Sequence, residues 1–443
     1  MKSKLGIRRE DKNEWERRAP LAPEQVESLV RDNDIEVILQ PSDLRVFTNE
    51  EYIQAGAKIS EDLSSCPVIL GVKEIPADRL LPKKTYLFFS HTMKGQPKNM
   101  PMLRKMMDLG CRLIDYEGIT DTDGRRLVFF GRFAGLAGMI DSLWGLGRRL
   151  QAEGFQTALS DVRRTMDYGG LDWANEHIAW LGDWFGAKGL PDALTPMLIG
   201  FAGYGNVSKG AQEVIDLLPI EEIQANEIER LFARGGSRHV LYKVVFDESD
   251  TVEPKDSTQN FSQAEFVAHP DKYRSRFDRY LPRLTVLMNC TLWRPGAPRL
   301  VSMESLKRSF ARSDAPRLRI IGDVSCDAEG AIECNAQPGD PGRPFFTFDP
   351  NTGESAEGLT GAGVSVLSVD NLPAELPEES TRHFGKALLR FLPPLAAACA
   401  KDTVNSREFP SEIQKAMVME NGQFANRYAN MSAFLEEKPA KRK

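Results

Sequence analysis

Cysteine is scarce in this chain and is not arranged for cross-linking. No pair has the C-x-x-C spacing of a zinc or redox site, and the six residues are scattered as Cys66, Cys111, Cys290, Cys326, Cys334 and Cys399. Disulfide frameworks and structural zinc sites need cysteines at characteristic close spacings. The pattern therefore excludes both, predicts no metal ligands, and indicates reduced thiols in a cytoplasmic protein.

Long apolar runs and an excess of positive charge are also missing. No stretch has the length of a membrane span, and no apolar signal segment follows the start at residues 1–4. The formal net charge is −6 and the sequence isoelectric point is about 5.7, which argues against nucleic acid or an anionic membrane as partner. Repeats and low-complexity tracts are absent, and the basic stretch 438–443 is typical of a solvated tail.

The chain does have short apolar strands that alternate with amphipathic helices over 443 residues. This length exceeds one ordinary core and favours two domains. We predict an α/β protein with two Rossmann-like domains, parallel sheets and an interdomain cleft. A long apolar helix from about residue 135 marks the crossing between domains, and helices near residues 378–400 return to the first domain. The predicted domains are residues 1–135 with 369–443, and residues 136–368.

A glycine-rich turn near the middle of the chain predicts a dinucleotide site. The run Met197–Ile199 predicts a buried strand, and helical periodicity begins at Ala211. Glycines between them let the backbone approach a pyrophosphate, and a helix N-terminus supplies N–H groups. The third glycine position holds a serine, so a plain surface turn is the alternative. The predicted cofactor contacts are Gly203, Gly205, Asn206, Val207 and Ser208, together with the ends of later strands, Asn289, Asp323, Asn371 and Leu372.

The residues that should choose between NAD and NADP are ambiguous. An acidic residue near the end of the second strand holds the ribose 2′-hydroxyl in NAD sites, about 20 residues after the glycines. Residues 222–225 are the predicted second strand, and Glu227 follows it at a distance that suits NAD. Asn226, with an arginine from the following segment (Arg230, Arg234 or Arg238), would suit a 2′-phosphate.

Three apolar strands in the first half of the chain end in titratable residues. Residues 67–72, 85–90 and 111–116 are the predicted strands, and Lys73 with Glu74, His91 and Glu117 follow them. Because the carboxyl ends of parallel strands face one crevice, we expect these side chains to lie together. Histidine alone titrates near neutral pH without perturbation, which makes His91 the strongest single residue. The alternative is that each charge marks where the chain leaves the core.

Several long motifs in the chain resemble lysine–2-oxoglutarate reductase, the lysine-forming saccharopine dehydrogenase. The resemblance is strongest to the reductase half of the bifunctional animal and plant enzyme and extends from Gly6 to about Arg427. The motifs are residues 6–10, 13–23, 71–73, 88–92, 113–117, 205–212 and 370–374. The related alanine dehydrogenases share the implied fold but are less similar to this chain.

The resemblance implies condensation of L-lysine with 2-oxoglutarate to an imine, which hydride reduces to saccharopine. It assigns Lys73 and His91 as the acid–base pair, and Glu74 and Glu117 as acidic residues that tune the site and face the lysine amine. It assigns Arg18 and Arg126 to substrate carboxylates, which suits the planar fork of arginine. Without the resemblance, Arg18 could be one of several solvated charges.

The resemblance also implies NADPH as cofactor, since the animal and plant branch uses it, with NAD as the alternative. It allows association with a separate saccharopine-cleaving dehydrogenase, and a mitochondrial location if the chain is a processed domain of an animal-type enzyme. Two other functions stay open: an alanine-dehydrogenase-like amino acid dehydrogenase, and a catalytically silent relative that binds lysine or nucleotide.

Overall fold

The computed structural model describes residues 2–93, 95–311, 316–401 and 403–436, and it forms two compact units. The first comprises Met1–Phe130 and Pro377–Lys443, and the second Gly131–Leu376. The borders predicted from the sequence lie at 135/136 and 368/369 instead. The helix that begins at Gly131 packs along its whole length in the second unit, as does the turn Leu372–Glu375. The tail 438–443 lies outside the described residues.

The first unit is built on an eight-stranded sheet. Its strands, in sheet order, are β18 (Gln423–Phe424), β17 (Met417–Glu420), β6 (Arg112–Asp115), β5 (Thr85–Phe88), β4 (Val68–Leu70), β1 (Lys4–Ile7), β2 (Glu36–Leu39) and β3 (Lys58–Ile59). The strands from β6 to β3 are parallel, while β17 and β18 are antiparallel additions at one edge. The helices are α1 (Pro23–Asn33), α2 (Asn49–Gln54), α3 (Met100–Asp108), α11 (Pro377–Leu389), α12 (Leu392–Cys399), α13 (Ser411–Ala416) and α14 (Ser432–Glu436).

The second unit contains another eight-stranded sheet. Its order is β15 (Glu354–Glu357), β14 (Phe345–Asp349), β16 (Val364–Leu367), β13 (Ile320–Asp323), β12 (Val286–Asn289), β7 (Leu198–Ala202), β9 (Leu241–Phe246) and β8 (Ile220–Glu222). All strands from β16 to β8 are parallel, and β14 and β15 are antiparallel. The helices are α4 (Gly131–Ala152), α5 (Leu171–Lys188), α6 (Asn206–Ile215), α7 (Ile228–Arg234), α8 (Glu248–Thr251), α9 (Gln263–Ala268) and α10 (Met303–Ala311), and β10 (Val252–Pro254) pairs with β11 (Tyr273–Ser275).

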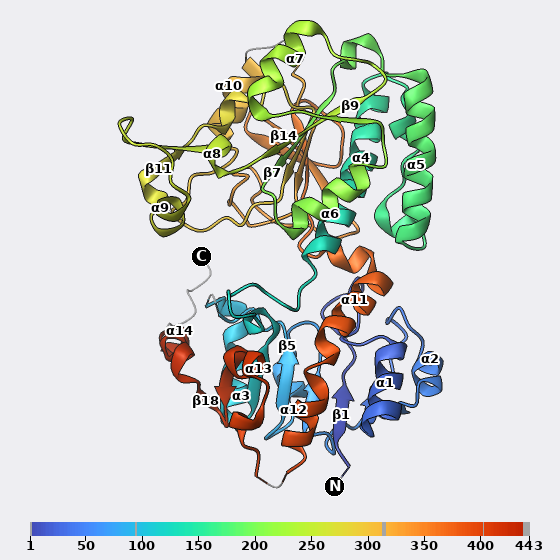
Figure 1. Cartoon of the computed structure of the whole chain (residues 1–443), viewed down its shortest axis with the longest axis vertical. Coiled ribbons are helices and arrows are strands. Elements are labelled where there is room, and N and C mark those ends of the chain that lie inside the picture. The colour runs from blue at the N-terminus through green and yellow to red at the C-terminus, as the bar shows by residue number, and fades with distance from the viewer. Residues whose placement is uncertain (1, 94, 312–315, 402, 437–443) are drawn as a thin grey trace. The chain divides into compact units, whose positions relative to one another are not determined.

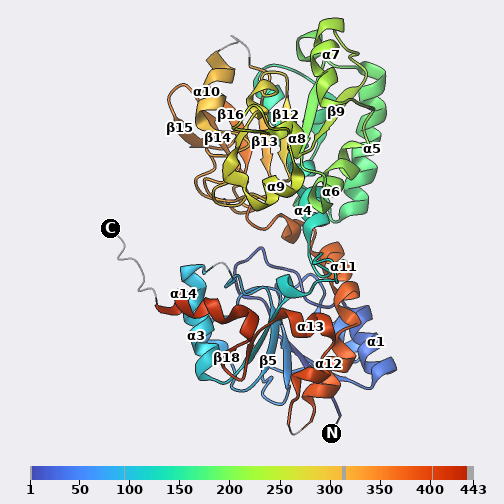
Figure 2. The same cartoon turned by 60° about the vertical axis from the view of Figure 1, so that its left-hand side comes forward.

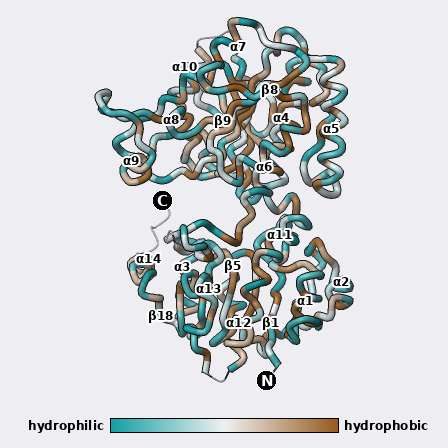
Figure 3. The backbone as a smooth tube through the Cα atoms, viewed as in Figure 1, coloured by the Kyte–Doolittle hydropathy of each residue, from teal (hydrophilic) through white to brown (hydrophobic). Residues whose placement is uncertain are grey.

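Alternate residues of the central strands build a core on each face of the second sheet. Ile199 and Phe201 pack with α4, α5 and α6, while Leu198 and Ala202 pack with α7 and α10. In Figure 1, α4 lies beside α6, which it contacts, and Figure 2 shows β12, β13 and β16 side by side with α10 on one flank and α5 on the other. The most hydrophobic parts of the backbone tube in Figure 3 are these strands and those of the first sheet. Burial on both faces explains why the strands are continuous apolar runs.

Two glycines allow α4 and α6 to touch at their backbones. A Cβ atom on Gly135 would lie 1.9 Å from the carbonyl oxygen of Val207, and one on Gly210 would lie 2.1 Å from the carbonyl oxygen of Arg132. No side chain fits at either distance. The N-terminus of α6 is therefore fixed against α4, directly after the glycine turn.

The predicted α/β class is confirmed, and the sheets are mostly parallel with antiparallel strands at one edge of each. The expected strands 67–72, 85–90 and 111–116 contain β4, β5 and β6, and the expected helices at 378–400 are α11 followed by α12. The six cysteines are free, as expected. The sequence pattern predicts no strand at β9, and this strand adjoins the predicted dinucleotide element at β7.

Candidate active site and cofactor site

In the first unit, Glu74 and His91 form a hydrogen-bonded pair at the carboxyl ends of neighbouring strands. His91 Nδ1 lies 2.8 Å from Glu74 Oε1, and Lys12 Nζ lies 3.4 Å from Glu74 Oε2. Burial alone would raise the pKa of Glu74, but the hydrogen bond and charge of His91, together with Lys12, hold that pKa well below its usual value. An ionised carboxylate only accepts hydrogen bonds. His91 Nδ1 therefore carries a proton and donates it, which leaves Nε2 as the nitrogen that can exchange a proton.

The backbone at His91 is strained and is held by its neighbours. Its φ of +48° lies in the left-handed region, which is uncommon for residues other than glycine. Asn99 Nδ2 donates to the carbonyl oxygens of Ser90 and His91, each at 3.2 Å. The His91 side chain keeps 27% of its surface exposed. Backbone strain at a partly exposed titratable residue is typical of functional sites.

Asp115 connects the ends of β5 and β6. Its Oδ2 accepts from the backbone N–H of Ser90 at 3.0 Å, and its Oδ1 accepts from the backbone N–H of Glu117 at 2.8 Å. Burial raises the pKa of this carboxyl group. Glu117 Oε2 in turn lies 3.3 Å from Arg126 Nη2, whose side chain is 51% exposed. The structure thus brings Glu117 and Arg126 together, and Asp115 links their segment to the one that carries His91.

Lys73 follows β4 and is buried, and its backbone is held by Glu10. Glu10 accepts from the N–H groups of Val72 at 2.8 Å and Lys73 at 2.9 Å. Desolvation raises the pKa of Glu10, against the effect of Arg8. Sequence reasoning gave neither Glu10 nor Lys12 a role at this site. Both lie in or beside motifs after β1, but only the sheet order β4-β1 shows that this segment adjoins Lys73 and Glu74.

Arg18 is more deeply buried than a surface arginine would be. Its Nε and Nη2 donate to the two carboxylate oxygens of Glu16 at 2.7 and 2.6 Å, and its guanidinium lies 4.2 Å from the centre of the Phe130 ring. The side chain is 1% exposed. One edge of the guanidinium thus donates two hydrogen bonds to Glu16. The role of Arg18 in binding a substrate carboxylate stays a prediction.

In the second unit, the glycine turn links β7 to α6 as the sequence predicted. Gly203 has a φ of +92°, and Gly205 is the N-cap of α6, with no side chain capping the helix. A Cβ on Gly205 would meet nothing within 4 Å, whereas Ser208 is completely buried against the helix. The backbone N–H groups of Asn206, Val207 and Ser208 stand in the first turn of α6, where no intrahelical partner exists. Open space in front of uncapped N–H groups fits a pyrophosphate.

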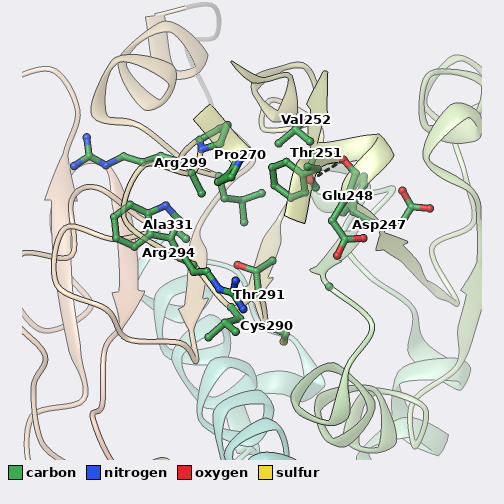
Figure 4. A pocket seen from close by; sticks show the side chains of 18 of the residues that line it. Asp247, Glu248, Thr251, Val252, Pro270, Cys290, Thr291, Arg294, Arg299 and Ala331 are labelled. Carbon is green, nitrogen blue, oxygen red and sulfur yellow. Dashed lines mark hydrogen bonds between the residues drawn. The ribbon is translucent and has the colours of Figure 1, made fainter. Parts of the chain in front are cut away.

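A cavity of about 410 Å³ opens at this turn. Its walls come from Gly203 to Gly205, from the end of β9 with α8, and from the loop after β12, as Figure 4 shows for Asp247, Glu248, Thr291 and Arg294. The donor set and the glycine cradle fit a nicotinamide dinucleotide. No group of three His, Cys, Asp or Glu residues in the described part of the chain could hold a metal ion.

Asn289 and Asp323 end their strands as expected but do not line this cavity. Asn289 Nδ2 donates to Asp323 Oδ1 at 2.8 Å, and Asn335 donates to the other oxygen at 2.7 Å. Burial raises the pKa of Asp323 to about 6. Asn289 also accepts from the hydroxyl of Thr291, a cavity residue, at 2.7 Å. The Asn289–Asp323 pair therefore holds the start of the loop after β12 through Thr291.

The remaining two predicted contacts lie near the end of the second unit. Asn371 is 8% exposed, and Leu372 belongs to the core, 3.3 Å from the Cβ position of Gly138. Neither lines the cavity at the glycine turn. Their roles as cofactor contacts stay predictions.

The predicted second strand is wrong in its place within the sheet. Residues 220–222 form β8 at the sheet edge, and β9 lies between β8 and β7. Glu227 accepts from the N–H of Gln224 at 3.0 Å. The three arginines that follow each form an ion pair, Arg230 with Glu227, Arg234 with Glu221 and Arg238 with Asp192. The residues beside the glycine turn are Asp247 and Glu248, which sequence reasoning missed. The mostly apolar run Leu241–Phe246, directly before Asp247, is the sequence signal that could have identified β9 as a strand.

The geometry can be compared with known proteins. Residues 6–137 match the family model for the alanine dehydrogenase/PNT N-terminal domain. The chain is 34% identical to the mitochondrial alpha-aminoadipic semialdehyde synthase of Bos taurus, over 99% of this chain and 48% of that protein. It is 25% identical to the saccharopine dehydrogenase (NAD(+), L-lysine-forming) of Emericella nidulans, over 91% of this chain and 94% of that protein. The chain thus spans about half the length of the animal relative.

Solved structures support the fold. An L-alanine dehydrogenase aligns over 98% of this chain and 99% of its own, with a TM-score of 0.62 and 17% identity. A transhydrogenase from Sinorhizobium meliloti aligns over 95% of this chain and 100% of its own, with a TM-score of 0.52 and 14% identity. At these identities the likeness establishes the two-domain Rossmann-like fold.

The fold is thus the one seen in an L-alanine dehydrogenase, and the curated relatives are dehydrogenases and synthases named for saccharopine and aminoadipic semialdehyde. The chain is similar over nearly its whole length to about half of animal alpha-aminoadipic semialdehyde synthase. The resemblance found in the sequence motifs is confirmed. Among the helices of the described residues, none combines the length and apolarity needed to cross a membrane.

Proposed function

We propose that the chain is a lysine–2-oxoglutarate reductase, which condenses L-lysine with 2-oxoglutarate and reduces the resulting imine to saccharopine. The observation that carries this proposal is the Glu74–His91 pair, with Lys12, beside the buried Lys73 at the ends of β4 and β5. The relatives are named for saccharopine and aminoadipic semialdehyde chemistry. A nicotinamide cofactor at the glycine turn of the second unit would supply the hydride.

The chemistry requires several proton transfers, which the cluster can perform. The lysine ε-amine must lose a proton before its nitrogen attacks the ketone carbon, and the carbinolamine oxygen must gain a proton to leave as water. His91 Nε2 can accept or donate a proton while Nδ1 stays hydrogen-bonded to Glu74. Lys73 is the second acid–base group, and it is buried. Burial disfavours the charged form of a lysine, which suits a group that gives up and regains a proton during the reaction. Arg18 and Arg126 are proposed to receive substrate carboxylates.

The test is NAD(P)H oxidation followed with lysine plus 2-oxoglutarate, against ammonia plus pyruvate. The second pair tests an alanine-dehydrogenase-like activity, because an L-alanine dehydrogenase shares the fold. Oxidation with the first pair only is the expected result. Activity with the second pair alone overturns the proposal, and activity with neither favours a silent binding relative. A cytoplasmic location and association with a separate saccharopine-cleaving dehydrogenase stay predictions.

The two arginines should respond differently to replacement by alanine. Arg126→Ala removes an exposed fork, so we expect the KM for 2-oxoglutarate to rise by about 10- to 100-fold, the equivalent of a charge-assisted hydrogen bond. Arg18→Ala should raise that KM too, and it also removes one partner of a buried pair, at a cost of about 3–5 kcal/mol in the free energy of unfolding. Steady-state kinetics and urea titrations measure both effects.

Arg125→Ala is the matched control, because Arg125 is the exposed neighbour of Arg126 and pairs with Asp123. It should change neither quantity. If Arg126→Ala raises the KM values of both substrates and the cofactor equally, Arg126 supports the fold instead of binding 2-oxoglutarate.

Ionised Glu74 should stabilise the first unit at neutral pH and lose this contribution to the free energy of unfolding in acid. Its folded-state pKa lies below the ordinary value of 4.5, so the unfolded chain binds the proton first as pH falls. The contribution of Glu74 is therefore complete above about pH 5 and is lost progressively as pH falls below about 4.5. Urea titrations of wild type and Glu74→Gln between pH 3 and 7 should show a stability difference that shrinks with falling pH. A difference independent of pH would contradict the assignment of an ionised Glu74.

A further inference from the structure

The strand that neighbours the glycine strand of the second unit ends in an acidic residue. β9 pairs with β7 in parallel register, with Phe246 opposite Ala202, and the N–H of Gly203 donates to the carbonyl oxygen of Phe246 at 3.0 Å. Asp247 is the next residue and lines the same cavity as Gly203 and Gly205. In doubly wound sheets the strand beside the glycine strand presents the residue that meets the adenosine ribose. Its position in the sheet, not its order in the chain, decides which residue that is.

The carboxylate of Asp247 is both oriented and accessible. Its Oδ1 accepts from the hydroxyl of Ser249 at 2.6 Å and from the N–H of Asp250 at 3.2 Å, which caps α8. Within the described residues no hydrogen bond or ion pair occupies Oδ2. Asp247 is exposed, and Figure 4 shows it with Glu248 on the α8 side of the cavity. A fixed carboxylate with one available oxygen suits a ribose hydroxyl.

The charges around Asp247 oppose a 2′-phosphate. Glu248, which accepts from the Tyr204 hydroxyl at 3.4 Å, and Asp250 add two more carboxylates within three residues. Arg299 lies in the cavity wall but is engaged by Glu333, and Arg276, near Asp250, faces Glu253 at 3.9 Å. Arg294 is the other cation that lines the cavity, and it belongs to the opposite wall, on the loop after β12. A 2′-phosphate carries close to two negative charges at neutral pH, which these carboxylates would repel.

We propose that Asp247 receives the 2′-hydroxyl of the adenosine ribose, and that this chain binds NADH in preference to NADPH. The inference rests on the dinucleotide site of the proposed reductase and goes against the NADPH expected from the resemblance to the animal and plant branch. Two of the arginines that would favour NADPH, Arg230 and Arg234, are paired around β8, on the far side of β9, and the third, Arg238, pairs with Asp192.

Direct titration of the full chain with NADH and with NADPH, followed by nicotinamide fluorescence or calorimetry, tests the proposal without either substrate. We expect NADH to bind the wild type at least about tenfold more tightly. Asp247→Ser should weaken NADH binding and strengthen NADPH binding, so that their ratio changes by about 10- to 100-fold, the range for a lost charge-assisted hydrogen bond. Serine is also a favourable N-cap residue, so α8 should still begin at Glu248 in this variant.

Glu227→Gln is the matched control, because it alters the carboxylate that follows β8 and should leave the ratio unchanged. Asp247→Asn, which keeps the shape and the capping oxygen, serves if the serine variant folds poorly. Equal or tighter binding of NADPH by the wild type overturns the proposal. An unchanged ratio in both Asp247 variants, or a changed ratio in Glu227→Gln, overturns the assignment to Asp247. A chain that binds NADH but does not oxidise it with lysine and 2-oxoglutarate overturns only the proposed reductase activity.

Discussion

Replacing His91 by asparagine should lower the turnover of saccharopine formation by about 10²- to 10⁴-fold, the usual contribution of a general acid–base group. Asparagine keeps a hydrogen bond to Glu74 within reach but has no nitrogen that titrates. Lys73→Met should have an effect of the same order, since it removes the second proposed acid–base group. The measurement is kcat as a function of pH with saturating lysine, 2-oxoglutarate and cofactor, with the cofactor Kd obtained by titration.

The cofactor Kd should be unchanged in both variants, because His91 and Lys73 belong to the first unit and the glycine turn to the second. His177→Asn is the control for a histidine without a role in the reaction. His177 lies on α5 and pairs with the Tyr168 hydroxyl at 2.9 Å, so its loss should leave turnover unchanged. Wild-type turnover in His91→Asn across the pH range would show that His91 does not transfer protons.

The close contact between α4 and α6 predicts a second large effect. Gly135→Ala would place a methyl group 1.9 Å from the carbonyl oxygen of Val207, a backbone atom that cannot rotate away. Overpacking a core costs about 1–3 kcal/mol and occasionally more, and we expect at least the upper end of this range in the free energy of unfolding. Dinucleotide binding should fall as well, because the first turn of α6 must shift. Thermal unfolding and cofactor titration measure the two effects.

Gly205→Ala separates binding from stability. The added methyl group meets no protein atom within 4 Å, and Gly205 has a φ of −76° that alanine adopts easily. Stability should therefore change by less than about 1 kcal/mol, while cofactor affinity should fall about tenfold or more because the methyl group stands where the backbone approaches a pyrophosphate. Unchanged affinity in Gly205→Ala would remove the glycine turn from the cofactor site.

The cluster of titratable residues at the carboxyl edge of the first sheet could be predicted closely from the sequence. The apolar runs before Lys73, His91 and Glu117 are long enough to be buried strands, and parallel strands bring their carboxyl ends to one edge. The pairing of His91 with Glu74 follows from the neighbouring positions of β5 and β4. The contribution of Lys12 and Glu10 could not be predicted, because they reach this edge through the pairing of β1 with β4, which are more than 60 residues apart.

The candidate cofactor site shows the opposite case. Local sequence determined the glycine turn, since glycine conformation and a helix start depend on adjacent residues. The residue proposed to meet the ribose could not follow from a count of residues, because β9 takes the place beside β7 that chain order would give to β8. Likewise, the sequence offered Arg18 as a solvated or substrate-binding charge, and only packing against Phe130 and Glu16 made it a buried ion pair.

The sequence by itself determined the class of fold, the glycine turn and the set of titratable residues at the strand ends, because each depends on short-range periodicity or local backbone conformation. The tertiary structure decided which strands are neighbours, and hence that Asp247 and not Glu227 adjoins the glycine turn. Strand order is set by which apolar faces pack best against the helices on both sides of the sheet. That competition is decided among segments distant in the chain, and no local pattern records its result.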